Sequence, residues 1–190
     1  MRNAEATRER ILQAAFAEFS AYGVAGARVD RIAKAADCNK NLIYIYFETK
    51  ETLFSTMLEK HLMRVFEDLA FTADDLPGFA TRMFDFAMAN PDLMRLIAWA
   101  GLEQRTGGSA VRDAAQNAKI AALTRAQADG SLATGFPPAF LLTAVMSLAT
   151  AWSAAGAFGP TIDPAADEHL SVLRDGIAAA VALLANAESS

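Results

Sequence analysis

Residues 42–47 have the sequence LIYIYF, and this run of large apolar and aromatic side chains is the feature that most constrains the fold. Ile, Tyr and Phe favour β-strands, but a strand needs a partner, and no second strand-like run lies nearby in the sequence. A helix over residues 40–47 instead places Ile43 and Phe47 four residues apart on one face. Asn39 stands at the expected N-cap position of that helix. We therefore predict a helix here.

Helical periodicity and capping signals recur along the rest of the chain. Ile11, Ala15 and Phe19 recur every four residues on one face, and Gly23 follows as a left-handed stop. We expect about nine helices, over residues 7–20, 29–36, 40–47, 49–73, 79–89, 93–102, 109–128, 137–158 and 163–184. The predicted fold class is all-α.

The distribution of charge is uneven along the chain. The formal net charge is −5, which argues against a generally basic nucleic-acid binder. Residues 1–60 hold nine Lys or Arg and eight Asp or Glu, whereas residues 61–190 hold eight and fourteen. The N-terminal part is therefore the only part that is not acidic, which favours a nucleic-acid-facing end there.

The most apolar segment spans residues 139–158 and contains no charged residue. Its length approaches that of a membrane-spanning helix. However, seven of its residues are Ala, which contributes little to partitioning into lipid, and four are Thr or Ser. We favour a helix buried within the protein or at a dimer interface over a membrane helix.

Two further features favour a cytoplasmic location. The N-terminus shows no charged region followed by an apolar segment, so we expect no signal peptide. Cys38 is the only cysteine and cannot form an internal disulfide, which fits a reducing compartment.

The sequence does not favour an enzyme. Catalysis needs a nucleophile with a base, paired carboxylates or clustered metal ligands. His61 and His169 stand alone on separate predicted helices, and Gly107-Gly108 lacks the spacing and the Lys of a phosphate-binding loop. We expect no catalytic residues, no metal and no cofactor.

The N-terminal helices form a helix-turn-helix pattern, with a longer helix followed by two short ones. The pattern comprises TRERILQAAFAEF, Tyr22-Gly23, VDRIAKAA, LIYIYF and TKETLF. These residues resemble the DNA-binding domain of the TetR (tetracycline-repressor-like) transcriptional regulators, over about a quarter of the chain. The resemblance implies a helix-turn-helix DNA-binding domain at residues 1–50 and a helical ligand-binding and dimerisation domain at residues 51–190.

The resemblance also implies a role for the third helix, which would enter the major groove of DNA with its N-terminal residues near base edges. Residues at the start of the following helix would hold a phosphate. The predicted DNA-contacting residues are Arg28, Lys40, Asn41, Leu42, Tyr44, Tyr46, Thr49 and Lys50. Alternatively, Tyr44 is a core residue, and Arg28, Lys40 and Lys50 are ordinary solvated charges.

The sequence departs from the family pattern at two positions. Ala27-Arg28 stand where small hydroxyl residues are common, which removes a helix cap and adds a cation. Asp37 stands where the turn often has Gly, which places a negative charge near the DNA-reading turn.

The resemblance further implies that the remaining helices form a ligand cavity and a homodimer. The predicted cavity residues are His61, Phe66, Phe84, Met88, Leu96, Ile97, Trp99, Glu103 and Leu123, with Arg105 and Gln116 as further polar candidates. Many of these are apolar or aromatic, so each is also a plausible core residue, and a mainly apolar pocket would take a hydrophobic or aromatic effector. The predicted dimer-interface residues are Ala144, Ala151, Trp152, Ala155, Leu170, Leu173, Ile177 and Leu184.

Together these inferences predict a cytoplasmic homodimeric repressor that binds double-stranded operator DNA with a palindromic sequence. A small molecule would change the spacing of its two DNA-reading heads through the fourth helix. The alternative is a ligand-blind helical dimerisation or scaffold protein with a weakened DNA-binding domain, which Asp37 and the near-neutral N-terminal charge motivate.

Overall fold

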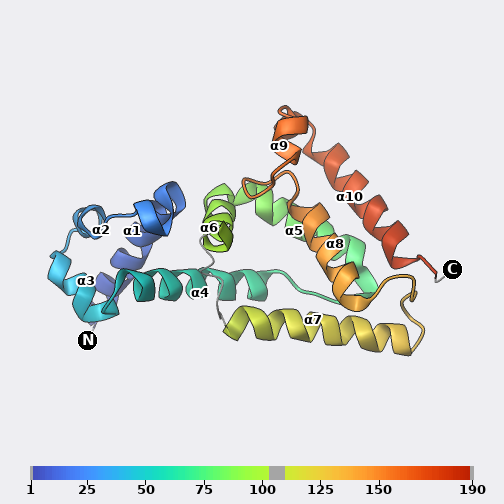
Figure 1. The fold of residues 1–190 in the computed structure, drawn as a ribbon, viewed down its shortest axis with the longest axis horizontal. Coiled ribbons are helices and arrows are strands. Elements are labelled where there is room, and N and C mark those ends of the chain that lie inside the picture. The colour runs from blue at the N-terminus through green and yellow to red at the C-terminus, as the bar shows by residue number, and fades with distance from the viewer. Residues whose placement is uncertain (1, 103–109, 189–190) are drawn as a thin grey trace. The chain divides into compact units, whose positions relative to one another are not determined.

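The computed structural model describes residues 2–102 and 110–188, and these are arranged entirely as helices and connecting turns (Figure 1). Within these ranges there are ten α-helices and no strand, which confirms the all-α fold. The helices are α1 (Arg2–Gly26), α2 (Val29–Ala35), α3 (Lys40–Phe47), α4 (Lys50–Asp68), α5 (Leu76–Ala89), α6 (Pro91–Leu102), α7 (Ala110–Ala128), α8 (Pro138–Thr150), α9 (Gly159–Ile162) and α10 (Leu170–Ala185). Short 3-10 helices lie at Ala73–Asp75 and Ala166–Glu168.

The chain divides into two compact units. Unit 1 comprises Met1–Arg64 and Asp92–Ser109, and unit 2 comprises Val65–Pro91 and Ala110–Ser190. Compact packing in unit 1 thus continues beyond residue 50 into α4 and also includes α6. The division of function after residue 50 stays a prediction.

In unit 1, α1 packs against α2 and against α4. The apolar stripe of α1 is buried, with Ile11, Ala15 and Phe19 fully inaccessible to solvent. The Phe19 ring meets the Phe54 ring of α4 edge-on, with the two centroids 5.2 Å apart. Gly23 interrupts the helical dihedral angles of α1 with φ 66° and ψ 179°, a conformation that suits a residue without a side chain. The predicted stop at Gly23 is therefore a kink within α1.

In unit 2, α5 packs against both α8 and α10, and α7 packs against α8. The core of this unit is apolar, with Phe79, Phe84 and Val145 almost fully buried. At the surface, the Arg174 guanidinium of α10 lies 3.0 Å from the Asp85 carboxylate of α5 and joins the two helices.

The predicted single helix over residues 137–158 is wrong, because α8 ends at Thr150. The Ser153 hydroxyl donates a 2.8 Å hydrogen bond to the Thr150 carbonyl, which takes up an acceptor at the helix end. Beyond it the chain folds back over Ala151. A Cβ at Gly156 would lie 1.9 Å from the Ala151 carbonyl oxygen, and a Cβ at Gly159 would lie 2.3 Å from it. These two glycines make the fold-back possible. The short helix α9 follows, and with it the described residues hold ten α-helices where about nine were predicted.

The last helix also begins later than predicted, at Leu170 rather than near Asp163. The Asp163 carboxylate is engaged instead with the ring of His169, at 2.8 Å. In the chain segments that the structure describes, none of the helices has the length and hydropathy that crossing a membrane requires.

Candidate nucleic-acid interface

The helix-turn-helix consists of α2, the turn 36–39 and α3, and its two helices pack through apolar side chains. Ile32 on α2 and Ile43 and Phe47 on α3 are nearly inaccessible to solvent. The Asn39 side chain accepts a 2.9 Å hydrogen bond from the Asn41 backbone N–H, which confirms Asn39 as the N-cap of α3. The opposite face of α3 is exposed to solvent.

The turn places Asp37 in the left-handed region, with φ 48°. Gly adopts this conformation at little cost, and Asp tolerates it better than most residues do. The geometry therefore gives a physical reason for the Gly that the TetR pattern often has at this position, and it shows that Asp37 fills the same backbone requirement.

The start of α2 is capped by Glu18, a residue of α1 that is 8% exposed. Its carboxylate accepts a 2.8 Å hydrogen bond from the Arg28 backbone N–H and a 2.7 Å hydrogen bond from Arg31 Nε. The Arg31 guanidinium also donates to the Gly26 carbonyl and lies over the Tyr22 ring, 4.3 Å from its centroid. Hydrogen bonding to Glu18 raises the pKa of the Arg31 guanidinium above its ordinary value.

Sequence reasoning missed the role of Glu18. The Ala27-Arg28 pair lacks the hydroxyl group that would cap α2 locally, and Glu18 supplies an acceptor from ten residues away. The signal in the sequence is a carboxylate that lies beside Phe19 on the buried side of α1.

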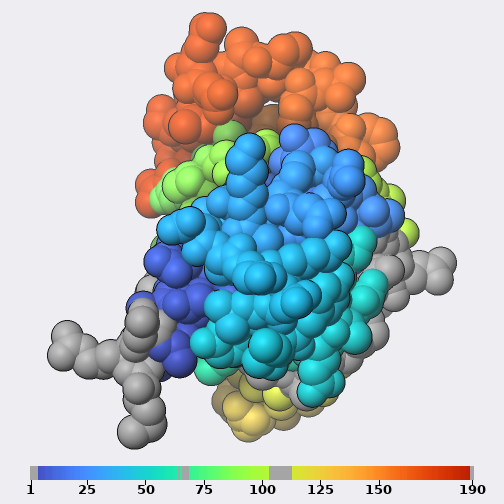
Figure 2. All heavy atoms as spheres, turned by 90° about the vertical axis from the view of Figure 1, so that its left-hand side faces the viewer, coloured from blue at the N-terminus to red at the C-terminus, as the bar shows by residue number. Residues whose placement is uncertain are grey.

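The beginning of α2, the exposed face of α3 and the beginning of α4 surround a surface depression of about 440 Å³. We call it the α2–α4 depression. Figure 2 shows this face of unit 1, where the light-blue and cyan atoms of α2 and α3 adjoin the start of α4. Its lining residues are Ala27, Arg28, Val29, Asp30, Lys40, Tyr44, Glu48, Thr49, Lys50 and Glu51. It therefore brings together Arg28, Lys40, Tyr44, Thr49 and Lys50 from the predicted DNA-contacting set.

Two of the cations at the depression, Lys40 and Lys50, have protein partners. Lys40 Nζ lies 2.8 Å from Asp30 Oδ1, an ion pair that joins α3 to α2. Hydrogen bonding to Lys40 lowers the pKa of the Asp30 carboxyl, and the same bond raises the pKa of Lys40. Lys50 Nζ donates to the Ala27 carbonyl oxygen at 3.3 Å, which holds the side chain across the start of α2.

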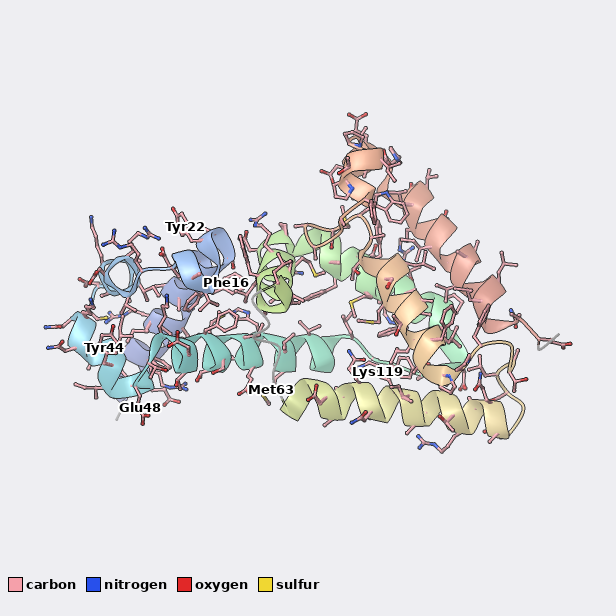
Figure 3. The ribbon with its side chains drawn as sticks, in the orientation of Figure 1. Phe16, Tyr22, Tyr44, Glu48, Met63 and Lys119 are labelled. Carbon is pink, nitrogen blue, oxygen red and sulfur yellow. The ribbon has the colours of Figure 1, made fainter. Side chains whose placement is uncertain are left out.

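The start of α4 has the predicted cap. The Thr49 hydroxyl accepts a 3.0 Å hydrogen bond from the Thr52 backbone N–H. Between α3 and α4 the chain turns at Glu48, which has φ 60° and lines the depression. Tyr44 and Glu48 are labelled in Figure 3, on α3 and in the turn that follows it.

The exposed face of α3 carries both polar and apolar side chains. Tyr44 is 41% exposed and Ile45 is 74% exposed, while Leu42 is half-buried and Asn41 is exposed. Ile45 is absent from the predicted contacts, although its position two residues after the buried Ile43 indicates the opposite face. An exposed Ile on this helix has the chemistry to contact a thymine methyl group.

Tyr46 lies apart from the depression. Its side chain is half-buried, and its hydroxyl donates a 3.2 Å hydrogen bond to the Ala4 carbonyl in the first turns of α1. Tyr46 therefore ties α3 to α1, and its contact with DNA stays a prediction.

The predicted ligand-binding residues divide between the two units. In unit 1, Leu96 is buried, Ile97 is half-buried and Trp99 is 36% exposed. The His61 ring stacks on the ring of Phe16, with centroids 4.3 Å apart. In unit 2, Phe84 and Leu123 are buried and Met88 and Gln116 are half-buried. The side chain of Phe66 and all of Glu103 and Arg105 lie outside the described residues. The ligand site stays a prediction.

The predicted dimer residues also need a correction of their local structure. Ala151, Trp152 and Ala155 lie in the turns after α8 and do not form a helical stripe. Ile177 is 3% exposed within its own unit, which leaves it almost no surface for a second copy. Half-buried positions are Ala144, Leu170, Leu173 and Leu184, whereas Phe140, Val172 and Leu183 are the large apolar residues that α8 and α10 expose. Dimerisation stays a prediction.

Among the described residues, no three His, Cys, Asp or Glu side chains are grouped so that they could hold a metal ion. The Cys38 thiol is half-buried in the helix-turn-helix, and this burial raises its pKa. It is therefore less nucleophilic at neutral pH than an exposed thiol.

Two family models match the chain. The model described as "Bacterial regulatory proteins, tetR family" matches residues 11–57, and "Tetracyclin repressor-like, C-terminal domain" matches residues 75–182. A related protein, the HTH-type transcriptional repressor SCO4008 of Streptomyces coelicolor, is 38% identical over 151 residues, which are 78% of this chain and 79% of that protein. The HTH-type transcriptional repressor NicS of Pseudomonas putida is 33% identical over 53% of this chain and 51% of its own.

Solved structures agree with these matches. SCO4942 from Streptomyces coelicolor, described as a transcriptional regulator, superposes with a TM-score of 0.80 and 37% identity, over 92% of this chain and 96% of its own. FadR from Bacillus subtilis, solved in complex with stearoyl-CoA, gives a TM-score of 0.66 at 19% identity, over 91% and 96% of the two chains. The second likeness is one of fold alone.

Proposed function

The chain belongs to the TetR family of bacterial regulatory proteins and is a transcriptional regulator, and on this premise we propose that it is a homodimeric repressor that a small molecule releases from a palindromic operator. The observation that carries the proposal is the α2–α4 depression. It collects Arg28, Lys40 and Lys50 beside the hydroxyl groups of Tyr44 and Thr49. Cationic and hydroxyl groups are the side chains that bind DNA phosphates.

In the proposed complex, α3 enters the major groove and the depression receives the sugar–phosphate backbone at the edge of that groove. Asn41, Leu42 and Ile45 face base edges, because they lie on the exposed or half-buried side of α3. Thr49 and Lys50 hold a phosphate at the start of α4, where the backbone N–H groups and the helix dipole favour negative charge. Two copies would place their α3 helices about one DNA turn apart, roughly 34–36 Å.

Release by a ligand is the second part of the proposal. Helix α4 is shared by the two units, since residues up to Arg64 belong to unit 1 and those from Val65 to unit 2. The ligand would bind more tightly to a conformation in which the separation of the two α3 helices does not match the operator. A preference of about 1–3 kcal/mol for that conformation lowers operator affinity about 5–150-fold. The predicted ligand residues are mostly apolar, so the proposed effector is hydrophobic. We place the protein in the cytoplasm, with access to DNA, and assign it no catalytic activity.

A test of the proposal starts with selection of bound duplexes from a random DNA pool, at two salt concentrations. The expected result is enrichment of a palindrome with half-sites about ten base pairs apart, bound more weakly at the higher salt concentration. Hydrophobic compounds are then screened for release of that duplex. Failure to enrich any sequence at either salt concentration would refute operator binding.

A second candidate function is a dimerisation or scaffold role without DNA reading. The carboxylates of Asp30, Glu48 and Glu51 favour it, because they offset the three cations at the depression. Absence of enrichment together with a stable dimer in sedimentation would support this alternative.

A further inference from the structure

The ion pair between Lys40 and Asp30 lies on the proposed DNA-binding face and not in the core. Nζ and Oδ1 are 2.8 Å apart, and the two side chains are 46% and 57% exposed. Both residues line the α2–α4 depression. An exposed ion pair contributes little to folding, so its main effect is on the charge that the depression presents to a partner.

We propose that Asp30 competes with DNA phosphate for Lys40 and thereby limits the affinity of the protein for any duplex. The inference rests on the proposed DNA-binding function. Lys40 is the first residue of α3, and Asp30 is in the first turn of α2, so the pair bridges the two helices of the helix-turn-helix. A phosphate that approaches Lys40 must displace a carboxylate that already binds the ammonium group.

The salt dependence of binding gives the size of the effect. A lysine that contacts a phosphate releases about 0.9 of a condensed cation from B-DNA. When Lys40 leaves Asp30, the carboxylate is left without its partner beside the phosphates and takes up a cation from solution. The two changes nearly cancel, so Lys40 adds little affinity while Asp30 is present.

Replacement of Asp30 removes that cancellation. Asp30→Asn keeps the size of the side chain but removes its charge. The slope of log K against log salt then becomes steeper by about 0.9, and affinity at 0.1 M salt rises roughly eightfold and converges with the wild type near 1 M. Because phosphate contacts carry no sequence information, operator and unrelated duplexes gain alike. The consequence is that Asp30 lowers the affinity for operator and unrelated duplexes by the same factor, and the ratio of the two affinities depends on base contacts.

Two control variants separate pairing from net charge. Glu48→Gln also removes one negative charge from the depression, but the ion-pair partner of Lys40 is Asp30 and not Glu48. We therefore expect Glu48→Gln to raise DNA affinity less than Asp30→Asn does. Asp92→Asn removes one negative charge from an exposed ion pair with Arg95 on α6, in unit 1. Asp92 does not line the depression, so we expect this variant to change DNA affinity least.

The experiment measures binding of the full chain to the selected operator and to a scrambled duplex, by fluorescence anisotropy from 0.05 to 0.5 M salt. Circular dichroism melting verifies that each variant is folded. As a second measurement, Lys40→Gln costs less affinity in the wild type than in the Asp30→Asn background, because only the latter has Lys40 free for phosphate.

Several outcomes would overturn the inference. If Asp30→Asn and Glu48→Gln raise DNA affinity equally, Asp30 acts only through the net charge of the depression. If Lys40→Gln lowers affinity equally in the wild type and in the Asp30→Asn variant, Asp30 does not compete with phosphate for Lys40. Loss of operator binding alone would make Asp30 a base-reading residue. An unfolded Asp30→Asn protein would make the pair structural. In contrast, lack of salt-dependent binding by the wild type would defeat the proposed function itself.

Discussion

Replacement of Glu18 tests whether a buried carboxylate from α1 holds the helix-turn-helix together. Glu18→Ala removes the hydrogen bond to the Arg28 backbone N–H and the pair with Arg31. Loss of an N-cap typically costs about 1 kcal/mol, and loss of a hydrogen bond to a charged group costs about 1.5–3 kcal/mol. Because the Arg31 side chain is 42% exposed, water replaces part of the second contribution. We expect a loss of about 2–3 kcal/mol in the free energy of unfolding.

Glu18→Gln provides a graded comparison. The amide oxygen still accepts from the Arg28 backbone N–H, but the charge that pairs with Arg31 is lost, so we expect a loss of about 1 kcal/mol. For a chain of 150–250 residues, each kcal/mol shifts the melting temperature by about 2–4 °C. The Ala variant should therefore melt roughly 4–12 °C below the wild type, and the Gln variant roughly 2–4 °C below it.

The assay is urea and thermal unfolding of the full chain followed by circular dichroism. The control is Glu9→Gln, which breaks the ion pair between Glu9 of α1 and Lys60 of α4. Both side chains are half-buried, and neither caps a helix. That variant should stay within about 0.5 kcal/mol of the wild type. A loss below about 0.5 kcal/mol for Glu18→Ala, or equal losses for Glu18→Ala and Glu18→Gln, would refute the assignment of Glu18 as a charged cap.

Four further predictions concern the helix-turn-helix and the start of α4. Lys50→Ala should weaken operator binding several-fold with little change in melting temperature, and unchanged affinity in an anisotropy titration would contradict the phosphate role. Tyr46→Phe should weaken operator binding without unfolding the protein and also cost about 0.5–1.5 kcal/mol from its bond to Ala4; unchanged binding in the same titration would leave Tyr46 only its contact with α1. Asp37→Gly should stabilise the protein by about 1 kcal/mol, because φ is 48° there, and urea unfolding measures the sign. Ile45→Ala should leave the melting temperature unchanged, since the side chain is 74% exposed, but alter the sequence selected from a DNA pool.

The sequence alone determined the local structure of the DNA-reading segment. The bounds Lys40–Phe47, the Asn39 cap and the Thr49 cap follow from side chains and backbone groups within four residues of one another, and all three are confirmed. The all-α fold is also a local property, because each helix shows its own apolar residues at helical spacing in the sequence. The sequence motif placed both Lys40 and Lys50 in the predicted DNA-contacting set. In the structure, both residues line the α2–α4 depression.

Only the tertiary structure decided which charges meet. Glu18 caps α2 from ten residues away, and Asp30 pairs with Lys40 across a turn, so neither contact has a signature in a short window of sequence. The end of α8 has the same origin, since Gly156 becomes informative only when the chain folds back onto the Ala151 carbonyl. Propensity and capping act over a few residues, whereas ion pairs, buried caps and close backbone approaches depend on where distant segments pack, and that is a property of the folded chain.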